Sequence, residues 1–228
     1  MTKVGVLKSG LNNLQTDVDR ILEMIGYRPS EKERVLLKPN IVVNARPEQG
    51  AATHPGLIEA LARWFQKKGK EVVVAEGTGI YSSDKAFARL VKDAGYAYLR
   101  DELDIPLVNL EQAKHREVPW AFGRIALPEL LWECEYVNVP TLKTHVQTTV
   151  SLAVKNQKGL IPMETKKRFH KKGLHERIYE LSRVVRPELT VADGFYCIEG
   201  DGPTGPPAGT LKKMDLLIAG MDMMAVDN

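Results

Sequence analysis

The chain has 228 residues, of which 43% are hydrophobic and 27% are charged, and its formal net charge at pH 7 is +3. This composition is typical of a globular domain and excludes a chain that is disordered throughout. The charge is well below that of a dedicated nucleic-acid-binding protein, although it suits an anionic ligand.

The two cysteines, Cys134 and Cys197, form no Cys-x-x-Cys pair. They are too few for a four-thiolate zinc site or an iron–sulfur cluster, so this chain supplies no iron–sulfur ligand set. The N-terminal sequence MTKVGVLKSG lacks the apolar region of a signal peptide, and no stretch approaches the ~20 apolar residues of a membrane span. We therefore expect a cytoplasmic protein that makes no membrane contact.

Short apolar runs alternate with helical patterns over the first hundred residues. Strands are predicted at 4–7, 35–37 and 72–75, where the residues are apolar without a break. A helical stripe with a 3.6-residue period follows each strand, and glycines at 26, 69 and 95 end the three helices.

The second half of the chain is less regular. Residues 96–131 carry a weak pattern and are predicted to form a small inserted or edge region. Further strands are expected at 137–139, 189–192 and 216–219, and a helix at 174–185. The segment KKRFHKK, residues 166–172, is predicted as a basic loop. If residues 150–155 are helical, Thr148 and Thr149 lie in the first turn of that helix, which favours anions.

The repeated order of strand, loop and helix predicts the α/β fold class, with a mostly parallel sheet and helices on both faces. We expect a single α/β domain over residues 1–228. A helical pattern begins at Ala225, just before the chain ends. The sequence is therefore either a truncated piece of a longer protein or a chain without this last helix.

Polar residues follow the predicted strands. In an open parallel sheet the loops after the strands share one edge, and ligands bind there, where the strand order reverses. We therefore expect a common pocket. The predicted ligand-binding residues are Lys38, Asn40, Thr53, His54, Gly77, Thr78, Gly79, Thr144, Lys155, Asn156 and Lys158.

The residue types in this set favour an anion. Lysines hold phosphate or carboxylate groups as point charges, and a Gly-Thr-Gly turn before a helix exposes backbone N–H groups. The alternatives are a solvated strand end for Lys38 and a plain tight turn for Gly77 and Gly79. The sequence contains neither GxGxxG nor GxxxxGK[ST], which excludes a standard dinucleotide fingerprint and a Walker loop.

Three residues are candidate catalytic groups, namely His145, Lys143 and Asp193. His145 would transfer a proton because imidazole titrates near neutral pH, and it is equally compatible with a metal ligand or a packing residue. Glu199 and Asp201 would hold a divalent metal or, with Asp193, act as bases, and the alternative is ordinary turn chemistry.

Several blocks occur in an order that resembles the family of domain of unknown function 362. They are VLLKPNIV, THPGLIEAL, VVVAEG, VPTLKTHVQTTVSLAVKNQKGLIP, VADGFYCIEGDGPTGPPAG and AGMDMMAVD, from about Val35 to Asp227. The resemblance implies a cytosolic prokaryotic protein whose relatives often carry ferredoxin-like iron–sulfur modules beside this domain, and it implies that the family continues beyond Asn228. Any redox role of this chain would need a partner protein.

The sequence therefore predicts a polar cleft for a small anionic ligand that carries phosphate or carboxylate, in an enzyme-like domain. One alternative is a non-catalytic binding or maturation module that docks an iron–sulfur or redox partner. Another is nucleic-acid binding through residues 166–172. That segment has one aromatic residue, Phe169, and lacks a stacking platform, so nucleic acid is the least favoured partner. A flap that closes over the anion is a further hypothesis for the same segment.

Overall fold

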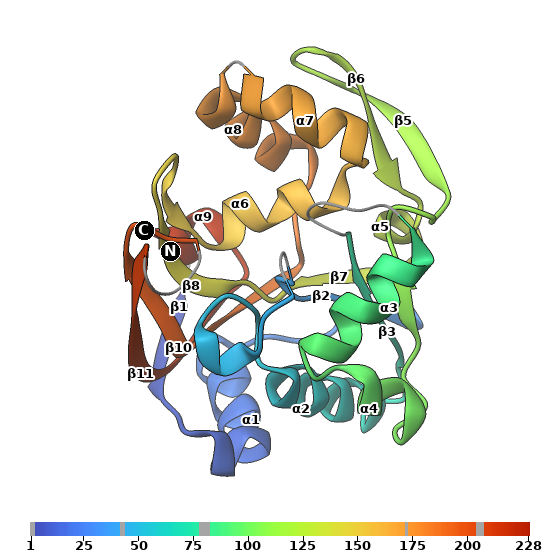
Figure 1. The fold of residues 1–228 in the computed structure, drawn as a ribbon. Coiled ribbons are helices and arrows are strands. Elements are labelled where there is room, and N and C mark those ends of the chain that lie inside the picture. Colours follow the sequence, from blue (N-terminus) through green and yellow to red (C-terminus); the bar gives the residue numbers. More distant parts are fainter. Residues whose placement is uncertain (1–2, 42–43, 78–82, 172, 204–207) are drawn as a thin grey trace.

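A computed structural model describes residues 3–41, 44–77, 83–171, 173–203 and 208–228. Within these ranges, nine strands form one sheet and two strands form a separate hairpin (Figure 1). The sheet contains β1 (Val4–Lys8), β2 (Arg34–Lys38), β3 (Glu71–Glu76), β4 (Leu107–Asn109), β7 (Glu135–Asn138), β8 (Thr141–His145), β9 (Thr149–Ser151), β10 (Leu189–Gly200) and β11 (Gly209–Gly220). The hairpin is formed by β5 (His115–Trp120) and β6 (Gly123–Pro128).

The helices alternate with these strands. They are α1 (Leu14–Ile25), α2 (Pro55–Gln66), α3 (Asp84–Asp93), α4 (Ala97–Asp101), α5 (Leu130–Glu133), α6 (Ala153–Asn156), α7 (Met163–Lys171), α8 (Leu174–Val184) and α9 (Met223–Asp227), with 3-10 turns η1 (Leu11–Asn13), η2 (Pro47–Gln49) and η3 (Gln157–Leu160). Helix α2 begins at Pro55, as predicted, because proline suits the first helical turn. Within the described ranges, the helices are too short or too polar to cross a membrane.

The order of strands in the sheet is β1-β11-β10-β7-β2-β3-β4. From β10 to β4 neighbouring strands run parallel, whereas β11 pairs antiparallel with both β1 and β10. Strand β8 lies parallel to β10, and β9 turns back on β8. The predicted mostly parallel sheet is therefore confirmed. The chain leaves β2 toward β3 in one direction and β7 toward β10 in the other, so the strand order reverses between β2 and β7.

Helices cover both faces of the sheet, as the sequence predicted. In β2, Val35 and Leu37 belong to the core cluster on the side of α1 and α2, whereas Leu36 packs on the opposite side with Leu181 of α8. Figure 1 shows α1, α2 and α4 on one side of the sheet and α6, α7 and α8 on the other. This double burial explains why the central strands are apolar without a break.

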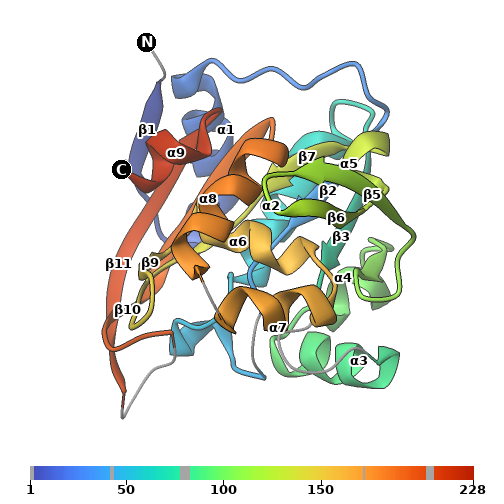
Figure 2. The same ribbon diagram turned by 90° about the horizontal axis from the view of Figure 1, so that it is seen from above.

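The region predicted as inserted or at an edge contains the edge strand β4 and the β5–β6 hairpin. Seen from above, the hairpin lies over the central strands, beside α8 (Figure 2). Trp120 of β5 stacks on Phe169 of α7 with ring centroids 5.5 Å apart and an interplanar angle of 10°. The hairpin therefore fixes α7 above the sheet.

The prediction of a basic loop at residues 166–172 is wrong. Residues 163–171 form α7, and residue 172 lies outside the described ranges. Phe169 is fully buried on the inner side of α7, while Lys167 and Arg168 are exposed. The basic residues therefore lie on the outer side of a helix whose inner side is held by Phe169.

The structure differs from two further local expectations, although the strand expected at 189–192 is present. Residues 150–155 do not form one helix, because β9 occupies residues 149–151 and α6 begins only at Ala153. The strand predicted at 189–192 continues to Gly200, because β10 pairs with β11 as a long antiparallel hairpin. Asp193 therefore lies within a strand and not in a loop after one.

Candidate functional site

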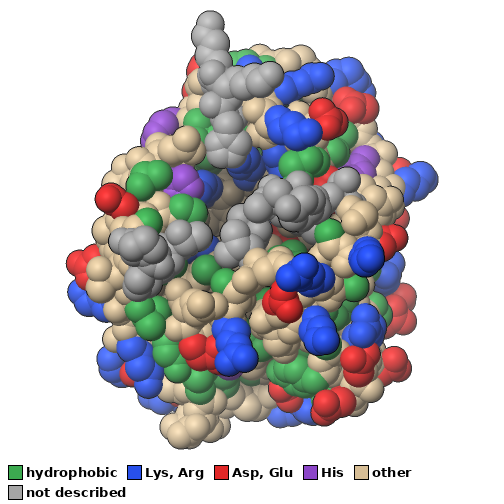
Figure 3. Space-filling model, viewed as in Figure 1, with side chains coloured by type: hydrophobic (Ala, Val, Ile, Leu, Met, Phe, Trp, Pro, Cys, Tyr) green, Lys and Arg blue, Asp and Glu red, His purple; other side chains and the backbone are tan. Residues whose placement is uncertain are grey.

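A cavity of about 320 Å³ lies where the strand order reverses. It is enclosed by the ends of β2 and β3, by β8, and by α6, η3 and α7. Its described lining consists of Asn40, Glu76, Gly77, Lys143, His145, Ser151, Lys155, Asn156, Lys158, Gly159, Met163, Lys166, Lys167 and Pro203. Figure 3 shows a hollow in this face of the molecule, with lysine or arginine side chains inside it.

The lining carries a strong excess of positive charge. Lysines at 143, 155, 158, 166 and 167 face one carboxylate, that of Glu76, among the described lining residues. Lys166 is paired with the nearby Glu111. A cleft lined by one sign of charge focuses the electrostatic field and attracts ions of the opposite sign. The described lining of the cavity therefore has a positive electrostatic character.

Lys38 and Glu76 form a buried ion pair at the edge of the cavity. The Lys38 ammonium donates to Glu76 Oε2 at 2.9 Å, to Asn156 Oδ1 at 3.1 Å and to Pro39 O at 3.0 Å. Burial lowers the pKa of Lys38, and the attraction of Glu76 opposes this shift. Glu76 also accepts from Gly77 N and Ile41 N, so the pair ties the ends of β2 and β3 together.

Asn40 links this pair to Lys143. Asn40 Nδ2 donates to Asn156 Oδ1 at 3.1 Å, and Lys143 Nζ donates to Asn40 Oδ1 and to Ala51 O, both at 2.7 Å. Burial lowers the pKa of Lys143 to about 8, against the raising effect of Glu76 and Asp193. The amine of Lys143 is thus held in a fixed position by two acceptors.

Lys155 and Lys158 differ from the buried lysines because both are partly exposed to the cavity. Burial lowers the pKa of Lys155 to about 7, and repulsion from Lys143 and Lys158 adds to the shift. Burial and repulsion from Lys166 lower the pKa of Lys158 to about 8. An anion among these amines would relieve the repulsion.

His145 reaches the cavity because side chains of β8 alternate between two sides. Thr141, Lys143 and His145 are buried on one side, and Leu142 and Thr144 lie on the other. Gln147 N donates to Nδ1 of His145 at 3.1 Å. In the neutral imidazole this bond leaves the proton on Nε2, which makes His145 a donor at that nitrogen.

The short helix α6 is anchored at both ends. Asp227 of α9 accepts from Ala153 N at 2.7 Å and from Val154 N at 2.9 Å. At the other end, Asn156 Nδ2 donates to Asn138 Oδ1 at 2.8 Å. Burial raises the pKa of Asp227 to about 6, although its two backbone hydrogen bonds oppose the shift. These contacts fix the backbone that carries Lys155.

Two glycines let the loops around the cavity approach closely. A Cβ on Gly159 would lie 2.5 Å from both Lys38 Nζ and Glu76 Oε1, and a Cβ on Gly77 would lie 2.3 Å from Gly159 O. The turn after β3 therefore packs backbone to backbone against η3. The predicted glycine at 77 serves this close approach, while Thr78 and Gly79 lie outside the described residues.

Some predicted ligand residues lie away from the cavity lining and hold the structure together. Thr53 is fully buried, accepts from Asn40 N and donates to Val139 O. His54 caps α2 by accepting from Gly56 N at 3.1 Å, and its own backbone N–H donates to Asp193 Oδ2 at 2.6 Å. Both residues join the loop before α2 to the end of the sheet.

Asp193 is buried behind these residues. Its two oxygens accept from His54 N and from Phe195 N, and burial raises its pKa to about 6. Thr144 donates to Ile198 O at 3.1 Å on the other side of β8 from the cavity. Asp193 and Thr144 therefore hydrogen-bond within the surrounding structure. Neither residue belongs to the described lining of the cavity.

Glu199 and Asp201 lie in the exposed part of the β10–β11 hairpin. Glu199 pairs with Lys212 at 3.1 Å. The described residues contain no group of three or more His, Cys, Asp or Glu side chains close enough to hold a metal.

Sequence reasoning missed Glu76, Lys166 and Asp227. The position of Glu76 could have indicated a role, because this acidic residue directly follows the continuously apolar strand predicted at 72–75. Lys166 lies in the segment 166–172, which the sequence predicts as a basic loop, with a flap over the anion as a further hypothesis. Asp227 carried no local signal, since its partners Ala153 and Val154 lie more than seventy residues earlier in the chain.

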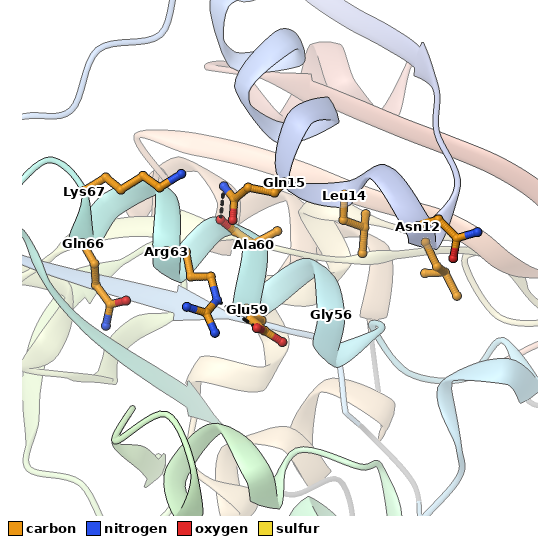
Figure 4. Close-up of a pocket in the computed structure, with 10 residues that line it drawn as sticks. Asn12, Leu14, Gln15, Gly56, Glu59, Ala60, Arg63, Gln66 and Lys67 are labelled. Carbon is orange, nitrogen blue, oxygen red and sulfur yellow. Dashed lines mark hydrogen bonds and ion pairs between the residues drawn. The ribbon is translucent and has the colours of Figure 1, made fainter.

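A second hollow of about 740 Å³ lies between the start of α1 and α2 (Figure 4). Two of its charged groups pair on the helix surface, where Arg63 lies 2.9 Å from Glu59. Gln15 Nε2 donates to Ala60 O at 3.3 Å across the hollow. It lacks the buried charges of the lysine-lined cavity, so we place the candidate site in the latter.

Three comparisons place the chain among known proteins. A family model described as a domain of unknown function (DUF362) matches residues 35–228. The thylakoid-associated protein sll1697 of Synechocystis sp. is 29% identical over 202 residues, which cover 86% of this chain and 61% of that protein. The chain thus spans about three fifths of the length of that relative. A crystal structure of a Thermotoga maritima protein is 12% identical, with a TM-score of 0.44, over 95% of this chain and 57% of its own.

Proposed function

The chain belongs to the DUF362 family, and from this premise we propose that its cavity binds a small anion, bearing carboxylate or phosphate, in an enzyme-like domain. The observation that supports the proposal is the composition of the lining, five lysines against one carboxylate among its described residues. That carboxylate, Glu76, is already paired with Lys38. Lys166 pairs with Glu111 and Lys167 with Glu164, so Lys143 and Lys155 are the lining cations that we propose a ligand neutralises.

Each group has a distinct part in this proposal. Lys155 and Lys158 contact the anion, because their amines face the cavity. Lys143 adds positive charge from a fixed position, since its amine is held by Asn40 Oδ1 and Ala51 O. His145 donates a hydrogen bond from Nε2 to an oxygen of the ligand.

The cytoplasm is the location that we propose, because two free, buried cysteines suit a reducing compartment. The word thylakoid in the name of the Synechocystis relative describes that protein. Docking of a redox protein and binding of nucleic acid stay predictions from the sequence. Cell fractionation of the native host followed by immunodetection tests the location, and recovery in the membrane fraction would contradict it.

Isothermal titration calorimetry of the full chain with inorganic phosphate and with oxalate tests the proposal. We expect Lys158→Gln to weaken binding of at least one of these anions about tenfold or more, about 1.4 kcal/mol. The control is Lys114→Gln, which removes an exposed lysine that pairs with Glu129 outside the cavity. Absence of binding by the unmodified chain, or an equal effect of both substitutions, would contradict an anion site in this cavity.

A further inference from the structure

Building on the proposed anion site, we propose that Lys155 is a nucleophile that forms an imine with the carbonyl group of a small oxo acid. The inference specifies the ligand as an anion that carries an aldehyde or ketone carbon next to its acidic group. It rests on how the lysines around the cavity differ in their contacts.

The amine of Lys155 has no hydrogen-bond or ion-pair partner among the described residues. The other amines around the cavity are engaged. Lys38 pairs with Glu76, and Lys143 donates to Asn40 and Ala51. A nucleophilic amine must keep its lone pair available, so Lys155 is the amine that this arrangement leaves ready to react.

The backbone that carries this amine is nevertheless fixed. Asp227 holds the start of α6, and the neighbouring Asn156 contacts Asn138 and Lys38. A reacting group on a rigid segment stays close to its productive position. Lys155 therefore combines an anchored main chain with an amine that has no partner among the residues that the structure describes.

The charges around Lys155 favour its neutral form. Burial and the cations Lys143 and Lys158 lower its pKa to about 7, so about half of the Lys155 amines are unprotonated at pH 7. For an ordinary lysine with a pKa of about 10.4, the unprotonated fraction at pH 7 is roughly one in 2,500. A larger fraction of the Lys155 amines is therefore unprotonated at pH 7 than of an ordinary lysine.

The step balances with groups that line the cavity. The Lys155 nitrogen attacks the carbonyl carbon, and its proton moves to the carbonyl oxygen to give a carbinolamine. The hydroxyl group then leaves as water after it accepts a proton, which the Lys158 ammonium donates. The products are a protonated imine and one water molecule. The acidic group of the ligand stabilises the positive charge of the imine.

A small oxo acid fits the remaining features. Its carboxylate would lie between Lys143 and Lys158, the two cations that act on Lys155 in the free protein. The volume of about 320 Å³ suits a ligand of a few heavy atoms.

Reductive trapping tests the imine. The full chain is incubated with glyoxylate and sodium cyanoborohydride at pH 7, and the modified lysines are identified by peptide mass spectrometry. We expect Lys155 to be labelled at least about tenfold faster than the exposed Lys114, and excess oxalate to suppress the labelling. Lys155→Arg keeps the positive charge but removes the nucleophile, so labelling at this position is lost and should not move to Lys158. Lys114→Arg should leave labelling of Lys155 unchanged.

The outcomes separate this inference from the proposed function. If calorimetry shows that oxalate binds while Lys155 is labelled no faster than Lys114, the imine is rejected and the anion site stands. If oxalate does not bind and Lys155 is not labelled, both are rejected. If the cavity lysines of Lys155→Arg are labelled in total as much as those of the unmodified chain, the assignment of Lys155 is also overturned.

Discussion

The ammonium group of Lys38 lies 2.9 Å from Glu76 Oε2, and both side chains are almost completely buried. This pair joins the ends of β2 and β3 at the point where the strand order reverses. It neutralises the acidic residue of the cavity lining and leaves the remaining lysines to face the cavity. The pairing of Lys38 with Glu76 therefore adds to the positive character of the site.

Removing one member of this pair should destabilise the protein strongly. In Glu76→Gln the Lys38 ammonium keeps its charge in a buried position without its counter-ion, which costs about 3–5 kcal/mol. Urea unfolding followed by circular dichroism measures the change. The double variant Lys38→Met/Glu76→Gln should lose less stability than the sum of the two single variants. A strictly additive double variant would show that the two residues are not coupled.

A methyl group at position 159 should disrupt the same pair by steric conflict. The added Cβ would lie 2.5 Å from Lys38 Nζ and from Glu76 Oε1, so Gly159→Ala should lower the free energy of unfolding by about 1–3 kcal/mol. Gly10→Ala is the matched control, since no atom lies within 4 Å of a Cβ built there. If both variants unfold at the same urea concentration, the close approach of η3 to the pair is wrong.

Asp227 should matter for the ligand as well as for stability. Asp227→Ala removes the acceptor for two N–H groups of α6, which should lower stability by about 1–2 kcal/mol and weaken oxalate binding, because α6 carries Lys155. Ser83→Ala removes a comparable cap from α3, where Ser83 accepts from Ala86 N. We expect that control to lose stability without loss of oxalate affinity. If calorimetry shows that Asp227→Ala binds oxalate with unchanged affinity, the anchoring of α6 by Asp227 does not contribute to ligand binding.

Asp193 predicts a specific pH dependence of stability. Burial raises its pKa to about 6 in the folded protein, from about 3.8. Between these values the folded state binds more protons than the unfolded state, so this residue makes stability fall as pH rises. The stability of the unmodified chain minus that of Asp193→Asn should therefore fall from pH 4 to pH 6, by at most about 1.4 kcal/mol per pH unit. A difference that stays constant or rises in urea unfolding across this range would contradict the prediction.

The sequence predicted the central strands because burial on both faces makes them continuously apolar, as in Val35–Leu37 and Val72–Ala75. The sequence did not predict β8. Most residues of this strand are polar, among them Lys143 and His145, and such a segment is typical of a loop. The lysines of the site could be predicted from their position after strands. Their partners could not, since Glu76 meets Lys38 across 38 residues and Asp227 meets Val154 across 73. Pairing over such distances is set by the tertiary fold and leaves no local pattern.

Heteronuclear NMR titration of the lysine side chains, with and without inorganic phosphate or oxalate, tests the anion site most directly. We expect the pKa of Lys155 to be about 7 and that of Lys158 about 8 in the free protein, and both to rise when the anion binds, because an opposite charge favours the ammonium form. The exposed Lys114 should not respond. Ordinary lysine pKa values in the free protein, with no change on addition of either anion, would contradict the account.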